Sequence, residues 1–229
     1  MKNKFFSFIL FWMLPLFTSA QDASIIISKC LNKLNQVQDY TANASIKSDI
    51  PFIKILTVKA TVYFKQKDHF RIISKGIAVL PKQGFTNLSK LLNEKEKYSA
   101  IYSGKEMIEK TNSDIITILP NGDTSDLILV KLWIDPEKDI IRKAQITTIS
   151  SGTIVTEYQY GSQTAFGLPD HIVFTVDAKK FKIPKGIATD INRSSTPENS
   201  KTNAKTGKIY VQLSDYQINK GIKDDVFIR

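Results

Sequence analysis

The stretch from Leu127 to Asp177 constrains the fold most, because it has the pattern of four β-strands in succession. Each expected strand is bounded by a turn signal, and the four are Leu127–Ile134, Ile140–Ile149, Thr153–Tyr160 and His171–Asp177. In the last one, Ile172, Phe174 and Val176 alternate with His171, Thr175 and Asp177. Because side chains alternate across a strand, this pattern predicts a sheet with one apolar and one solvated face.

The first twenty residues have the pattern of a secretory signal peptide. Lys2 and Lys4 precede an apolar run, and small residues end the segment at Ala20. We expect cleavage before Gln21, which leaves residues 21–229 as one exported domain. The alternative is an uncleaved membrane anchor, but the run is short for a membrane span and is interrupted by Pro15.

The rest of the chain favours further strands and only two helices. Apolar residues recur at helical spacing from Ser24 to Val37, and a short helix is expected around Leu88–Leu92. Shorter strands are expected at 42–46, 58–65, 70–74, 98–102, 105–109, 115–119 and 209–213. The polar stretch 188–206 predicts a mobile loop.

The balance of strands and helices predicts a cavity. About ten strands with short connections form an antiparallel sheet, and a sheet of this length must curl, split or close. Two helices cannot cover its apolar face, and each large apolar side chain left in water forgoes about 1.5–3 kcal/mol. We therefore predict a mainly β, α+β fold: a single strongly curved antiparallel sheet, an unclosed barrel, with an N-terminal helix and a short helix as lid. The alternative is a two-sheet sandwich or a closed barrel with a filled interior.

Four segments carry a signal beyond secondary structure. They are Val62–Arg71, Leu132–Pro136, Gly167–Ile172 and Tyr216–Phe227, the last with the pattern Tyr-x-x-Asn-x-Gly-x-x-Asp-x-x-Phe. In this order they resemble segments of the periplasmic lipoprotein carrier family (LolA-like). The sequence departs from that family at Lys67 and Ile72, where the family usually has proline and tryptophan.

The resemblance implies a periplasmic carrier that binds the acyl chains of lipoproteins in a hydrophobic cavity and ferries them towards the outer membrane. Its implied partners are acylated lipoproteins or another lipid, an inner-membrane release complex and an outer-membrane receptor. We expect a monomer. Because one fold serves several functions, an envelope sensor or structural protein that reads a lipid or peptide ligand for a partner is the alternative.

Two sets of apolar residues are expected to enclose the acyl chains. The cavity wall is expected to contain Val58, Ala60, Val62, Phe64, Phe70, Ile72, Ile172, Phe174 and Val176. The lid is expected to contain Ile27, Leu31, Leu34, Leu88, Leu91 and Leu92. For any single member, ordinary core packing is the alternative role.

Arg71 is the charged residue that we single out, at the lip of the cavity. It alternates with Phe70 and Ile72, so its side chain is expected on the solvated face, where it can bind a carbonyl or an acid. An arginine of the family is implicated in holding the lid shut. A solvated strand arginine is the alternative.

Catalytic, metal-dependent and nucleic-acid functions lack sequence support. His69 and His171 are the only histidines, Cys30 is the only cysteine, and the chain contains no familiar catalytic or nucleotide-binding motif. We expect no enzyme activity, no catalytic residues, no metal and no cofactor; a secreted hydrolase with an unfamiliar site is the alternative. The net charge of +10 is compatible with nucleic-acid binding, but export and the lack of an aromatic-basic motif argue against it.

Overall fold

The computed structural model describes most of the chain after the predicted signal peptide. The described residues are 22–51, 53–54, 56–67, 69–76, 78, 80–81, 87–122, 126–178 and 206–228. The predicted signal peptide and almost all of the predicted loop at 188–206 lie outside them. No helix in these ranges is long and apolar enough to cross a membrane.

Two α-helices occur within the described ranges. Helix α1 spans Ala23–Leu34 and α3 spans Asn87–Asn93. The Asp22 side chain caps α1 by accepting a hydrogen bond from the Ser24 backbone N–H at 2.8 Å. The predicted helix continued to Val37, whereas α1 ends at Leu34. Val37 follows the helix and is buried. Its apolar side chain lies at helical spacing from Leu34, so the pattern alone extended the predicted helix too far.

Within the described residues, eleven strands form one sheet. They are β1 (Asp39–Ile50), β2 (Ile53–Lys54), β3 (Val58–Lys65), β4 (His69–Ser74), β5 (Tyr98–Ile108), β6 (Thr111–Pro120), β7 (Leu127–Asp135), β8 (Ile140–Thr148), β9 (Gly152–Gln159), β10 (His171–Asp177) and β11 (Thr206–Ile218). Short 3-10 helices occupy Lys95–Lys97 (η1), Thr164–Phe166 (η2) and Asp224–Phe227 (η3).

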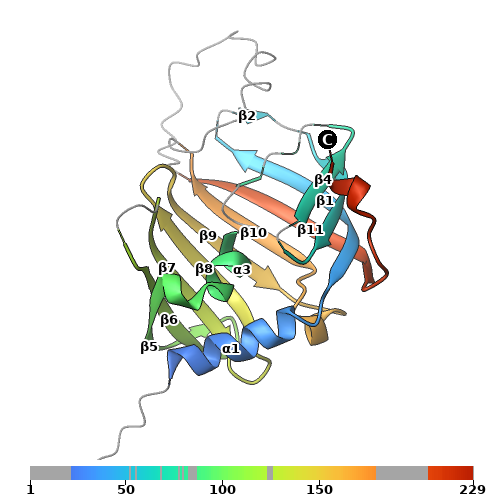
Figure 1. Cartoon of the computed structure of the whole chain (residues 1–229). Coiled ribbons are helices and arrows are strands. Elements are labelled where there is room, and N and C mark those ends of the chain that lie inside the picture. Colours follow the sequence, from blue (N-terminus) through green and yellow to red (C-terminus); the bar gives the residue numbers. More distant parts are fainter. Residues whose placement is uncertain are drawn as a thin grey trace, which may run out of the picture.

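The sheet is antiparallel and open. Its order is β4-β3-β1-β11-β10-β9-β8-β7-β6-β5, with β2 attached to β1. The described strands at the two ends, β4 and β5, do not pair with each other. The sheet curves around one side, and α1 and α3 lie across that concave side (Figure 1). The predicted unclosed, strongly curved sheet is therefore confirmed, and the sandwich and closed-barrel alternatives are excluded.

Strand boundaries differ from the prediction at two places. The expected strands at 98–102 and 105–109 are one strand, β5, with irregular pairing between Tyr102 and Lys105. Gly104 lies at this irregularity with φ +104°, a conformation that glycine adopts without strain. Strand β11 is longer than the expected 209–213, because its polar ends also pair with β1 and β10.

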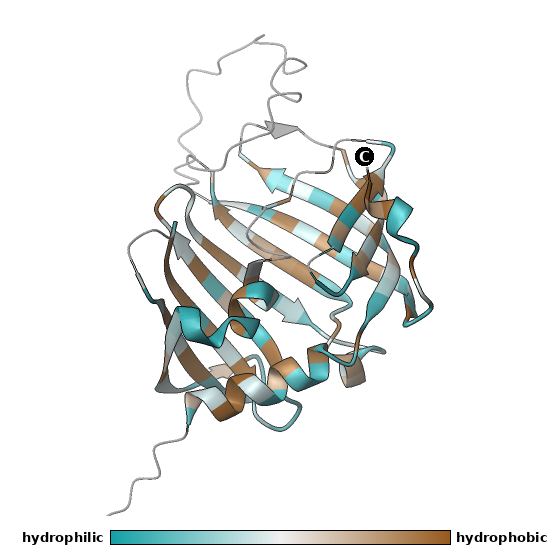
Figure 2. Ribbon diagram, in the orientation of Figure 1, coloured by the Kyte–Doolittle hydropathy of each residue, from teal (hydrophilic) through white to brown (hydrophobic). Residues whose placement is uncertain are grey.

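Apolar and polar residues alternate along the strands (Figure 2). The buried apolar side chains gather in two core clusters. The first cluster joins β1, β3, β10 and β11, with Phe174 and Ile209 fully buried and directly paired. The second cluster joins α1 and α3 to β5–β8, with Leu132 and Ile116 fully buried. Tyr158 packs against both clusters and so marks their junction.

Candidate functional site

A cavity of about 610 Å³ lies at this junction. The end of α1, α3, the β3–β4 hairpin and the start of β8 contribute to its wall, as do β9–β11. The two clusters are the cores of the two halves of the sheet, and the helices do not fill the space between them. The two helices do not cover the whole apolar face of the sheet, as predicted, and a cavity remains on its concave side.

Three of the nine residues predicted for the cavity wall line this cavity, namely Phe64, Phe70 and Ile172. The other six pack within the sheet beside it. They are Val58, Ala60, Val62, Ile72, Phe174 and Val176, and all are buried except the half-buried Ile72. The period-2 pattern placed each side chain on the right face, but only residues at one end of each strand reach the hollow.

The six lid residues divide in the same way. Leu34 of α1 and Leu88 and Leu92 of α3 line the cavity. Ile27 and Leu31 are buried in the second cluster, and the half-buried Leu91 packs against it. The helices therefore both complete the core and cover the cavity.

The cavity is also lined by four tyrosines that the sequence analysis did not select. They are Tyr40, Tyr158, Tyr160 and Tyr216. Burial is the first cause that raises the pKa of all four phenols, so they are uncharged at neutral pH. The Tyr160 hydroxyl donates to the Ile141 carbonyl (2.7 Å). The periodic pattern contained a signal for Tyr40 and Tyr158, because each continues the apolar alternation of its strand towards one end.

Aromatic stacking organises one part of the wall. The ring of Tyr40 stacks on that of Phe64 at a centroid distance of 5.2 Å. The ring of Tyr216 packs against Tyr40 in a tilted arrangement, at a centroid distance of 5.5 Å. The Tyr216 hydroxyl donates to the Pro169 carbonyl (2.7 Å), so its polar end faces backbone and its ring faces the cavity. Tyr216 thus presents aromatic carbon to the cavity while its own hydroxyl is satisfied by backbone.

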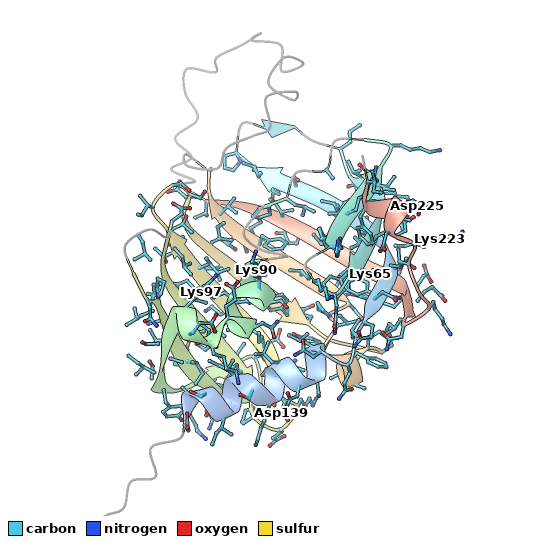
Figure 3. All side chains as sticks on the ribbon, in the orientation of Figure 1. Lys65, Lys90, Lys97, Asp139, Lys223 and Asp225 are labelled. Carbon is cyan, nitrogen blue, oxygen red and sulfur yellow. The ribbon has the colours of Figure 1, made fainter. Side chains whose placement is uncertain are left out.

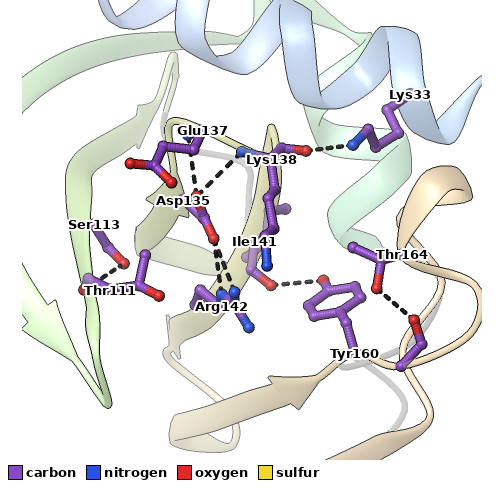
Figure 4. A network of polar contacts seen from close by, with 11 residues as sticks. Lys33, Thr111, Ser113, Asp135, Glu137, Lys138, Ile141, Arg142, Tyr160 and Thr164 are labelled. Carbon is purple, nitrogen blue, oxygen red and sulfur yellow. Dashed lines mark hydrogen bonds and ion pairs between the residues drawn. The ribbon is translucent and has the colours of Figure 1, made fainter.

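Below α1, a polar network fixes the turn that closes one end of the cavity (Figure 4). The buried Asp135 accepts hydrogen bonds from the backbone N–H groups of Glu137 and Lys138, and Arg142 pairs with its other oxygen at 2.8 Å. Lys33 of α1 donates to the Lys138 carbonyl. The turn and the helix are thereby held together beside the cavity.

The cavity has a polar mouth, which we define as its exposed lining residues Asn35, Lys67, Lys90 and Asn93. They come from the end of α1, the tip of the β3–β4 hairpin and α3. Gln66 joins two of these elements, because its amide donates to the carbonyls of Asn35 (2.9 Å) and Val37 (3.0 Å). The arrangement is apolar within and polar at the opening.

Arg71 does not line the cavity. It is half-buried on β4, and its guanidinium donates to the backbone carbonyls of Val226 (2.5 Å) and Ile228 (2.7 Å). Its partner is therefore the C-terminal segment, residues 219–228, and neither of these hydrogen bonds is to α1 or α3. The sequence analysis placed Arg71 at the lip of the cavity, with a carbonyl or an acid as its partner. Its partners are carbonyls, but they belong to the C-terminal segment and not to the cavity lining.

The C-terminal segment is clamped onto the β3–β4 hairpin by further contacts. Lys65 donates to the Ile222 carbonyl (3.0 Å) and pairs with Asp224 (2.6 Å), which lowers the pKa of that carboxyl. The buried Asp39 carboxylate accepts the backbone N–H groups of Lys220 and Gly221 at 3.1 Å. The polar residues of the ending motif thus have structural roles.

Solved structures share this architecture. A LolA superfamily protein from Nitrosomonas europaea superposes with a TM-score of 0.57 at 12% identity, covering 90% of this chain and 97% of that one. The fold is LolA-like. A putative outer membrane lipoprotein-sorting protein domain from Vibrio parahaemolyticus superposes with a TM-score of 0.59 at 8% identity (90% and 96% covered), and a DUF1329 family protein from Desulfovibrio piger with 0.56 at 10% (90% and 96%).

The LolA-like resemblance expected from the sequence is thus confirmed at the level of the fold. No family model matches the sequence, and no curated protein matches it either. At identities of 8–12%, these structures show a shared fold and do not identify the ligand. The ligand must be inferred from the cavity.

Proposed function

We propose that this protein is a periplasmic carrier that binds acyl chains, those of lipoproteins or of other lipids, in the cavity under α1 and α3. The observation that supports the proposal is the hollow of about 610 Å³ with aromatic and aliphatic walls and one polar mouth. Its size lies within the range of about 300–1,000 Å³ that is usual for ligand pockets. An amphiphile has the matching distribution of apolar and polar parts.

The energetics suit a carrier that must also release its ligand. Burying a chain of about 16 carbons is worth on the order of 13 kcal/mol gross, at ~0.8 kcal/mol per methylene. Leu88 and Leu92 belong both to the cavity wall and to the second cluster. Because α3 has only seven residues, we expect it to shift when a chain enters, and the cost of that shift keeps binding reversible.

The transfer role is part of the same proposal. The fold shared with a LolA superfamily protein and with a putative lipoprotein-sorting domain supports it. The protein would receive cargo from an inner-membrane release complex, act as a monomer, and deliver the cargo to an outer-membrane receptor. This is a binding function and requires no catalytic group.

Native mass spectrometry of the protein purified from the envelope of producing cells tests the proposal. We expect mass increments that correspond to acylated protein or lipid. A stable complex with one envelope protein, unchanged when the cavity is blocked, would instead favour the sensor alternative. A protein that carries no lipid and binds no added amphiphile contradicts the proposal.

A further inference from the structure

We propose that the mouth of the cavity selects amphiphiles with an anionic head group, a phosphate or a carboxylate, over neutral amphiphiles with the same chain. This inference rests on the proposed function, because it concerns the part of the ligand that remains at the opening when an acyl chain is inside. The groups that carry it are the ammonium groups of Lys67 and Lys90.

The two lysines reach the mouth from different elements. Lys67 lies at the tip of the β3–β4 hairpin, where its backbone has φ +67°. Lys90 lies on α3 (Figure 3). Both are exposed and both line the cavity. Neither side chain has an ion pair or a hydrogen bond with another described residue, in contrast to Lys65 on the same hairpin, which is paired with Asp224.

The acidic residues of the cavity lining are compensated by other cations. Glu94 pairs with Lys97 at 3.1 Å. Asp139 lies at the β7–β8 turn beside α1, away from Lys90 on α3 (Figure 3). Lys33 of α1 donates to the carbonyl of Lys138, the residue before Asp139, so a cation also lies beside this turn. Lys67 and Lys90 therefore leave a net positive charge at the opening.

Within the described cavity lining, an anionic head group finds no cation besides these two lysines. Among the described lining residues, charged side chains are limited to the two lysines, Glu94 and Asp139. The hydroxyl groups of Tyr160 and Tyr216 already donate to backbone carbonyls. Burying an anionic head group against this aromatic wall would cost desolvation free energy without an ion pair in return. The acyl chain is therefore expected to enter the cavity first, and the head group to stay beside the lysines.

The test compares head groups on one chain. Isothermal titration calorimetry of the protein expressed from the full sequence, at pH 8 and low salt, uses four probes below their micelle concentrations. They are palmitate, palmitoyl lysophosphatidylglycerol, palmitoyl lysophosphatidylcholine and monopalmitoylglycerol. We expect the two anionic probes to bind at least about fivefold more tightly than the two probes without net charge, since one lysine near a lipid surface is worth about that factor.

A matched pair of double variants assigns the preference to the mouth. Lys67→Gln with Lys90→Gln removes two charges there, and we expect the difference in affinity between the anionic probes and the probes without net charge to vanish. Lys47→Gln with Lys59→Gln removes two exposed charges from the outer face of the sheet, and we expect the preference to persist. Added salt is expected to weaken only the anionic probes.

The outcomes separate the two proposals. Preference for palmitate alone, or for the phosphate probe alone, supports the inference and identifies which anion is recognised. Equal binding of anionic and neutral probes overturns the inference and leaves acyl binding intact, as does a preference that survives in the mouth variant. Failure of all four probes to bind overturns both.

Discussion

Replacing Phe64 with aspartate tests whether the acyl chain binds in the cavity, because Phe64 lines the cavity without being fully buried in the core. Phe64 is half-buried, lines the cavity and stacks on Tyr40 at 5.2 Å. Phe174 was predicted for the same wall, but it is fully buried in the first cluster and does not line the cavity. Aspartate at the two positions is therefore expected to have different effects.

The stability costs follow from these environments. Phe64→Asp forgoes the stacking energy of about 0.5–1.5 kcal/mol and part of the burial energy of a phenyl group, about 2 kcal/mol in all. That loss corresponds to a fall in Tm of about 4–8 °C for a chain of this length. Phe174→Asp leaves a void and buries a carboxylate, a cost of about 5 kcal/mol or more, so we expect no stable fold.

The binding cost of Phe64→Asp comes from the charge in the wall. An acyl chain must either desolvate the carboxylate or leave about four methylenes outside, which costs about 3 kcal/mol and weakens affinity about a hundredfold. Thermal unfolding followed by circular dichroism measures the first effect, and calorimetry with monopalmitoylglycerol measures the second.

Thr61→Asp is the matched control, because Thr61 lies on the same strand with its side chain on the outer face. We expect it to lose stability, since aspartate disfavours strands, but to bind the chain normally. If Phe64→Asp folds and binds monopalmitoylglycerol as tightly as the unaltered protein, the cavity is not the binding site.

Three further predictions concern the C-terminal segment and the buried thiol. Arg71→Ala removes the donors to the Val226 and Ile228 carbonyls, so hydrogen exchange in residues 222–228 should accelerate while acyl binding stays unchanged; unaltered exchange would contradict the clamp. Asp39→Ala leaves two backbone N–H groups without their acceptor and should lower stability by about 1–3 kcal/mol, measured by urea unfolding. Burial raises the pKa of the Cys30 thiol from 9.0 to about 12. Because the folded state holds this proton more tightly, stability should fall as pH rises from about 9 to 12, and Cys30→Ala should flatten part of that fall; an identical pH profile in the variant would refute it.

Much of the sheet was predictable because local alternation reports which face each residue occupies. Ile172, Phe174 and Val176 are all buried, as their period predicted. What local pattern does not encode is how far along a strand the core ends and the hollow begins. That boundary depends on where Tyr158 and the helices meet the sheet, which is a property of the assembled fold.

The mouth of the cavity and the contacts of the C-terminal segment were less predictable for a related reason. Arg71 and its carbonyl partners are more than 150 residues apart, so the pairing follows from strand order and not from spacing. Similarly, no pattern in the sequence relates Lys67, in an expected turn, to Lys90, in an expected helix. Only the placement of α3 across the sheet brings them to one opening.

The place of β1 in the sheet has a consequence for the order of folding. β3 and β4 reach the rest of the sheet only through β1, and β1 reaches it only through β11, the last strand of the chain. Contacts between distant segments form slowly, because a long loop must close before they contribute. The N-terminal strands therefore lack this neighbour until β11 has been synthesised. That delay suits a polypeptide threaded unfolded through a translocation channel, which is the route that the first twenty residues predict.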